Sequence, residues 1–182
     1  MTNEKQNELF DTQQHSLGHS KAPVTIVEFA DFECGNCARA SLVIKQLLVA
    51  YEGQVYYIFR HFPLSNIHKS ADLMARAAEA AGLQGKFWEM HDLLFENQEV
   101  FSEVKVLELA QTIDLNLEVF QNDMRNKEVG LRIQRDRTVG EKRGVTSTPT
   151  FFVNGVKYKG SPDFESLSNV IESGIERKMK AA

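Results

Sequence analysis

The only two cysteines of the chain lie two residues apart, in Cys34-Gly35-Asn36-Cys37. The run before them is typical of a buried strand and the apolar spacing after them is typical of a helix, so the pair lies at a predicted helix N-terminus. Free backbone N–H groups and the helix dipole stabilise an anion there, which favours ionisation of the Cys34 thiol. Cys37, one helical turn along, can then attack a mixed disulfide at Cys34 and release the partner. The motif therefore predicts two-step thiol-disulfide exchange.

Other uses of a cysteine pair fit the sequence less well. A zinc site needs two more ligands, and no second Cys pair or His pair occurs at metal spacing. Nothing in the sequence indicates which histidine would pair with a nucleophilic cysteine of the protease type. We therefore expect no metal and no cofactor, while an inert structural disulfide stays open as an alternative. The histidines are scattered along the chain, at His15, His19, His61, His68 and His91.

Two further positions carry candidate chemistry. Glu28 interrupts an otherwise apolar strand, where burial disfavours a charged carboxyl, so it is a candidate acceptor for the proton of Cys37. An edge-facing or paired glutamate is the alternative explanation. Thr148-Pro149 precedes another strand, where a proline is awkward unless it forms a special turn, so a cis peptide bond is expected. The backbone of Thr148 is a candidate for pairing with an extended substrate.

The elements that must position these residues alternate between strand and helix patterns. Strands are predicted at 24–29 and 55–59. Between them a helix is predicted that starts at the cysteines, has apolar positions from Ala40 to Tyr51 and ends before Gly53. From 66 to 143 every segment has helical spacing, with N-caps expected at Ser102 and Asn116. Asn154-Gly155 between two short strand patterns predicts a hairpin, and Ser161-Pro162 is expected to cap a closing helix.

Composition limits the class of protein. The chain has 182 residues, of which 42% are hydrophobic and 25% charged. This is typical of a globular chain with one domain and room for an insertion. The formal net charge of −4 argues against nucleic acid as a partner. The basic stretch from Arg125 to Arg143 is interleaved with acids, which is typical of a solvated helix face.

The beginning of the chain bears on location. Residues 1–21 are polar and without periodicity, so a flexible N-terminal segment is expected. They contain no apolar core of a secretory signal, and no later stretch approaches the roughly 18 apolar residues of a membrane helix. The printed chain therefore predicts a cytoplasmic protein without a membrane span. A periplasmic or other extracytoplasmic location is the alternative, if a signal sequence has been removed.

The order of these elements resembles that of the bacterial DsbA-like thiol-disulfide oxidoreductases. It runs from the strand with Glu28 to the Cys34-Gly35-Asn36-Cys37 helix start, the helical block, Thr148-Pro149 and the hairpin. Two segments carry most of the resemblance, from Ala22 to Cys34 and from Gly144 to Gly155. The resemblance implies an α/β thioredoxin fold, a central mixed β-sheet flanked by helices, with an all-helical insertion domain. The thioredoxin-like domain would comprise 22–65 and 141–182, and the insertion 66–140.

The resemblance also implies roles at the site. Cys34 would be the nucleophile, Cys37 the resolving cysteine, Glu28 the buried acid and Pro149 the cis-proline. DsbA has Pro-His between its cysteines, whereas this chain has Gly35-Asn36, with the acidic Glu33 directly before Cys34. We therefore expect the pKa of Cys34 to be less depressed, and the disulfide less oxidising, than in DsbA.

We expect an oxidoreductase that acts on protein or peptide thiols and disulfides, and an additional redox partner to regenerate it. A reductase or an isomerase of the same fold is one alternative. A non-catalytic peptide-binding module with a structural disulfide is another, and metal handling is a third. The direction of electron flow, the client, the redox partner and the oligomeric state are not encoded in these patterns.

Overall fold

The structure, a computed structural model, describes residues 15–98 and 102–180, which form two compact units. Within the described chain, the sheet unit comprises 15–29, 39–60 and 149–180, and the helical unit comprises 30–38, 61–98 and 102–148. Helix α2 (Gly35–Ala50) begins in the helical unit and continues in the sheet unit, so both cysteines belong to the helical unit. The insertion limits expected near 66 and 140 stay a prediction.

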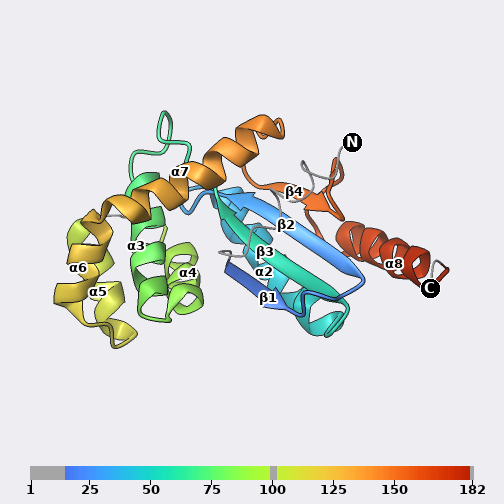
Figure 1. The fold of residues 1–182 in the computed structure, drawn as a ribbon, viewed down its shortest axis with the longest axis horizontal. Coiled ribbons are helices and arrows are strands. Elements are labelled where there is room, and N and C mark those ends of the chain that lie inside the picture. The colour runs from blue at the N-terminus through green and yellow to red at the C-terminus, as the bar shows by residue number, and fades with distance from the viewer. Residues whose placement is uncertain (1–14, 99–101, 181–182) are drawn as a thin grey trace. The chain divides into compact units, whose positions relative to one another are not determined.

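One sheet is described, with the strand order β1-β3-β2-β4-β5 (Figure 1). β1 is antiparallel to β3, and β4 is antiparallel to both β2 and β5. β2 and β3 are neighbours joined through α2, the kind of connection that parallel strands require. The sheet is therefore mixed, as expected. The strands are β1 His15–Gly18, β2 Val24–Ala30, β3 Val55–His61, β4 Thr150–Val153 and β5 Val156–Lys157.

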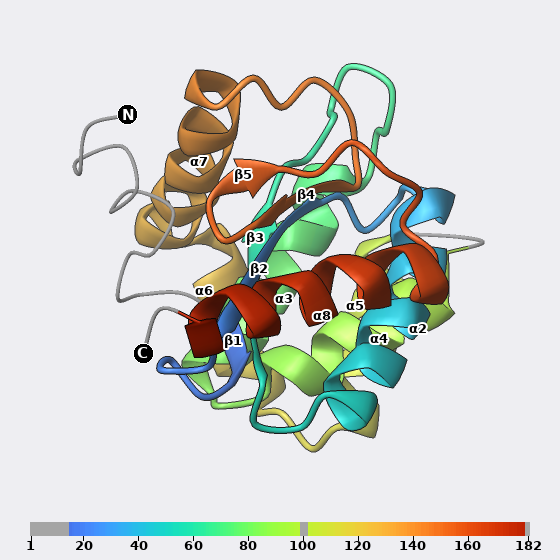
Figure 2. The same cartoon turned by 90° about the vertical axis from the view of Figure 1, so that its right-hand side faces the viewer.

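The two central strands are buried almost throughout. In β2 only Thr25, and in β3 only Tyr56, is half-buried rather than buried. Such strands need cover on both faces, which explains their dense β-branched and aromatic composition. Helix α8 (Phe164–Lys180) lies along the sheet in Figure 2. Tyr51, directly after the end of α2, contacts this helix, since its Oη donates to Glu172 Oε1 at 2.8 Å.

The hairpin prediction is confirmed. Asn154 and Gly155 join β4 to β5 with φ values of 48° and 78°. A two-residue hairpin turn with positive φ at both positions matches the right-handed twist of its strands, and Asn-Gly tolerates this conformation best. The next ladder bond, Tyr158 N to Phe151 O at 2.8 Å, shows that the pairing continues past β5.

The N-terminal expectation is wrong for residues 15–18. They form β1 at one edge of the sheet, with His15 opposite Phe59 and Gly18 opposite Tyr56. The strand is held by backbone pairing, which leaves no apolar alternation in the sequence to reveal it. At Gly18 a Cβ would collide with the carbonyl oxygen of Val55, so this register requires glycine. Residues 1–14 lie outside the described chain.

The cap of the closing helix is also corrected. Asp163, rather than Ser161-Pro162, caps α8, because its Oδ1 accepts from Ser166 N at 2.8 Å. Pro162 lies outside the helix and offers no side-chain acceptor. An aspartate at the N-cap performs the role that the expected serine would have had.

The helical unit contains the predicted helical block. Ser102 and Asn116 cap α5 and α6 by accepting from Lys105 N and Val119 N, which confirms both N-cap predictions. Helix α3 is central, since it contacts each of the other four. These helices are α3 Ala71–Leu83, α4 Phe87–Glu96, α5 Glu103–Thr112, α6 Leu117–Arg125 and α7 Lys127–Lys142.

Buried polar groups join α3, α7 and the end of β3. Glu79 Oε1 accepts from Arg132 Nε at 2.7 Å and lies 2.8 Å from His61 Nε2. Asp136 Oδ2 accepts from His61 N at 3.0 Å. The basic stretch is therefore not a wholly solvated helix face, because Arg132 and Asp136 turn inward. Removing one partner of such a buried network leaves the others uncompensated.

Across residues 15–98 and 102–180, no helix has the length and hydropathy needed to cross a bilayer.

Gly174 provides a test of helix packing in the sheet unit. A Cβ at this position would lie 2.8 Å from Cγ2 of the buried Val24. Gly174→Ala should therefore lower the unfolding free energy by about 1–3 kcal/mol, although alanine is the better helix former. Gly130→Ala in α7 is the matched control, because its Cβ would meet only the end of the Arg76 side chain. We expect the control to change stability by less than about 1 kcal/mol in denaturant titrations. Equal effects of the two changes would contradict this account.

Candidate active site

Both cysteines lie at the start of α2 as free thiols. The carbonyl of Cys34 accepts from Cys37 N at 2.9 Å and from Ala38 N at 3.2 Å, so Cys34 occupies the position that opens the helix. Cys34 is 8% exposed, whereas Cys37 is 0% exposed. An incoming disulfide can therefore reach the first sulfur but not the second. Gly35 and Asn36, between them, are exposed.

The structure brings Thr148 to Cys34. The Cys34 Sγ donates to the Thr148 carbonyl oxygen at 3.3 Å. The Thr148 hydroxyl is buried and has no hydrogen-bond partner among the described residues. A hydroxyl in this state can turn its hydrogen toward a negatively charged sulfur. The loop before β4 thus offers Cys34 an acceptor when it is a thiol and a donor when it is a thiolate.

The pKa of Cys34 is lowered from 9.0 to about 5. The largest cause is the hydrogen bond from the Cys37 side chain; burial opposes it, and Thr148 and the backbone amides of Cys37 and Asn36 add to it. Donors at a helix N-terminus stabilise the charged form of the acid, as the sequence predicted. The value lies between the ~7 of thioredoxin and the ~3.5 of DsbA. That is the direction expected for Asn36 in place of a histidine.

A buried carboxylate shapes the turn that leads to Cys34. Asp31 is 2% exposed, and its Oδ1 accepts from Glu33 N at 2.8 Å. Its Oδ2 accepts from Leu64 N at 2.8 Å and lies 2.8 Å from His68 Nδ1. The Asp31 carbonyl accepts from Cys34 N at 3.1 Å. Asp31 therefore holds the residues before Cys34 and the loop at 64–68 in one arrangement.

His68 brings a second titratable group to this arrangement. Burial by itself would lower the pKa of His68, but its hydrogen bond and charge attraction to Asp31 raise it, with smaller attractions from Glu33 and Cys34. An imidazolium and a thiolate that attract each other are each stabilised by the pairing. Glu33, expected to oppose the thiolate, has its Oε2 bound to Ser70 N at 2.7 Å.

Gln98 holds the same turn from another segment of the helical unit. Its Nε2 donates to Phe32 O at 2.6 Å and to Cys34 O at 3.1 Å. The amide therefore fixes the peptide groups that follow Phe32 and Cys34. Asp31, His68 and Gln98 carry no motif, so the sequence did not identify them. The clustering of Asp31 and Glu33 before the cysteines was the one available signal.

Glu28 and Pro149 belong to the sheet unit. Glu28 is 1% exposed in β2, and its Oε2 accepts from Tyr57 Oη at 2.6 Å. Because β2 is an interior strand of the sheet, Glu28 is not the edge-facing residue considered as an alternative. Pro149 directly precedes β4. The proton-acceptor role of Glu28 and the cis bond of Pro149 stay predictions.

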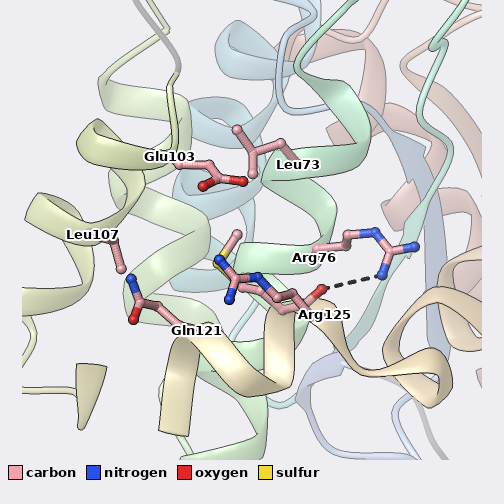
Figure 3. A pocket seen from close by; sticks show the side chains of 7 residues that line it. Leu73, Arg76, Glu103, Leu107, Gln121 and Arg125 are labelled. Carbon is pink, nitrogen blue, oxygen red and sulfur yellow. Dashed lines mark hydrogen bonds between the residues drawn. The ribbon is translucent and has the colours of Figure 1, made fainter. Parts of the chain in front are cut away.

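A pocket of about 370 Å³ lies elsewhere in the helical unit, among α3, α5 and α6 (Figure 3). One of its arginines, Arg76, donates from Nη1 to Met124 O at 3.3 Å. Glu103 and Arg125 bring opposite charges to its lining. None of the residues predicted to take part in thiol chemistry lines it. The candidate site for thiol chemistry is therefore the surface at Cys34, not this pocket.

Comparison with known proteins agrees with this geometry. A family model described as thioredoxin matches residues 11–173. A thioredoxin-like oxidoreductase from Silicibacter pomeroyi is 31% identical, with a TM-score of 0.81, over 97% of this chain and 98% of that chain. The oxidised form of BdbD from Bacillus subtilis is 25% identical, with a TM-score of 0.79, over 90% of this chain and 93% of its own.

A longer curated protein also matches. The Na(+)/H(+) antiporter NhaA 3 of Salinispora tropica is 42% identical over 163 residues, which are 90% of this chain and 25% of that protein. This chain thus spans about a quarter of the length of that relative. The chain therefore belongs to the thioredoxin family, and it has the DsbA-like form of the thioredoxin fold.

Proposed function

We propose that the protein is a thiol-disulfide oxidoreductase that acts on protein or peptide substrates through Cys34 and Cys37. One observation carries the proposal: a slightly exposed thiol with a pKa of about 5 lies one turn before a fully buried thiol. At neutral pH such a thiol is largely ionised, and the thiolate is the attacking species in exchange. A purely structural disulfide would not require that its two cysteines differ in exposure and acidity.

The proposed cycle balances in two steps. The Cys34 thiolate attacks one sulfur of a client disulfide, forms a mixed disulfide and releases the first client sulfur as a thiolate. Cys37 then loses its proton, attacks the Cys34 sulfur and expels the second client sulfur. The client gains two electrons, and Cys34–Cys37 becomes a disulfide. In reverse, the same steps oxidise a client dithiol, and a separate redox partner must restore the starting state.

The lowered pKa favours the oxidising direction. A stabilised thiolate stabilises the reduced protein, so its disulfide is more readily given away. We expect a reduction potential between the roughly −270 mV of thioredoxin and the roughly −120 mV of DsbA, a range that also includes isomerases. Equilibration with glutathione buffers measures it. In the cytoplasm, the location predicted from the printed chain, the pair would be held largely reduced, so this direction fits the extracytoplasmic alternative better.

Thr148 and Glu28 have supporting roles in this proposal. The Thr148 backbone, next to the nucleophile, would pair with the extended client chain, and Pro149 would shape that loop. The buried Glu28 carboxyl would take the proton of Cys37 during the second step. Both roles follow from the family resemblance and from the burial of these residues.

Cys37→Ser should trap the first intermediate. Without the resolving thiol, the mixed disulfide with a peptide client should accumulate and be visible by mass spectrometry. Cys34→Ser is the matched control and should give no adduct, because the remaining thiol is fully buried. Exchange by Cys34→Ser at the wild-type rate would overturn the proposed function.

Glu28→Gln should slow only the second step. Loss of a general base should reduce the rate of mixed-disulfide resolution by about 100-fold, while the attack of Cys34 is unchanged. Rapid-quench kinetics separates the two steps. Tyr57→Phe removes the hydrogen bond to Glu28 but leaves its carboxyl, so resolution should slow far less. An equal loss in both steps for Glu28→Gln would show that Glu28 is only structural.

His68→Gln should make Cys34 less acidic. With the imidazolium removed, the pKa of Cys34 should rise by up to about one unit, measured from the pH dependence of its alkylation. The difference should be largest below the raised pKa of His68 and vanish above it, where the imidazole is neutral. His19→Gln, at an exposed site in the sheet unit, is the control. An unchanged alkylation profile in a stably folded His68→Gln protein would contradict the coupling.

A further inference from the structure

The sheet unit contains a groove of about 730 Å³ between the β4–β5 hairpin and α8, two segments that are neighbours in Figure 2. Residues 153–159 form one wall, and residues 170–178 of α8 form the other. We call it the basic groove. Its volume is within the range of sites that hold small molecules. It contains none of the residues assigned to thiol chemistry.

Four cations line the basic groove, and no carboxylate does. Lys157 and Lys159 lie on the hairpin wall, and Arg177 and Lys178 lie on the helix wall. The chain as a whole has a net charge of −4, so this concentration of positive charge is local. Like charges on two walls of one groove repel each other unless an anion lies between them.

Neighbouring carboxylates do not neutralise three of these cations, Lys159, Arg177 and Lys178. Among residues 15–98 and 102–180, no ion pair involves Lys159, Arg177 or Lys178. Glu176 lies 3.7 Å from Lys180, at Oε2 to Nζ, and Asp163 is used to cap α8. The positive charge of these three side chains, which lie on both walls, is therefore available to a ligand.

The rest of the lining is mainly apolar. Val156 in β5 is 71% exposed, and the half-buried Val170 in α8 contributes further hydrocarbon surface. Exposed lysines alone are usually solvated. Here, cations on both walls flank an exposed valine surface, which favours a ligand that has both a charged group and an apolar part. Its charged group would lie between the cations, and its apolar part would cover the valines.

From these observations we propose that the basic groove binds a small amphiphilic anion, a carboxylate or phosphate joined to a hydrocarbon chain. This binding function is separate from thiol-disulfide exchange. The apolar lining distinguishes it from a site for a free inorganic anion. The concave shape distinguishes it from a flat surface that adheres to a bilayer.

Titration of the full-length protein with decanoate, decanol and acetate tests the proposal. Decanoate should bind, shift the methyl NMR signals of Val156 and Val170, and weaken as salt is added. Decanol, which has the chain without the charge, and acetate, which has the charge without the chain, should each bind at least about tenfold more weakly. Anionic phosphatidylglycerol vesicles and an acidic peptide serve as competing probes.

Charge reversal locates the site. Lys159→Glu combined with Lys178→Glu should weaken decanoate binding by at least about tenfold and leave exchange by Cys34 and Cys37 unchanged. Lys127→Glu, an exposed lysine at the start of α7, makes the same kind of change outside the groove and should have no effect. Decanol binding as tight as decanoate, or full binding by the double variant, would overturn the proposal. Binding only to vesicles, or only to the acidic peptide, would also overturn it, because the groove would then be a docking surface.

Discussion

An anion inside a folded protein needs donors directed at it, and the sulfur of Cys34 is the anion on which this structure depends. Burial works against its charge, so the helix amides, the Cys37 thiol and the Thr148 hydroxyl must outweigh that cost. These donors come from segments far apart in the sequence. The turn at Asp31, the start of α2 and the loop before β4 must therefore keep one arrangement for the sulfur to stay acidic.

The parts of this arrangement that the sequence predicts have local causes. A strand pattern followed by helical spacing places Cys34 at a helix start. Asn154-Gly155 predicts its hairpin because few residue pairs accept positive φ twice. Ser102 and Asn116 predict their caps because a short oxygen-bearing side chain reaches the next amides. Each signal lies within a few residues of the structure that it determines.

The parts that the sequence missed depend on contacts between distant segments. β1 is held by backbone pairing with β3, which leaves no pattern in its side chains. Asp31 and His68 meet across the chain, and nothing near His68 indicates that it would approach a carboxylate. Glu33 illustrates the same limit, since its position beside Cys34 suggested repulsion, whereas its carboxylate is bound to Ser70 N. Spacing reveals neighbours along the chain but not the direction in which a side chain turns.

Asp31 uses both of its oxygens, one for the peptide before Cys34 and the other for the 64–68 loop. The charge of the Cys34 sulfur also acts on His68, which lies on this separate segment. When the thiolate is consumed in a disulfide, His68 loses one of the attractions that keep it protonated. The proton affinity of the His68 imidazole therefore depends on whether Cys34 and Cys37 are reduced or joined in a disulfide.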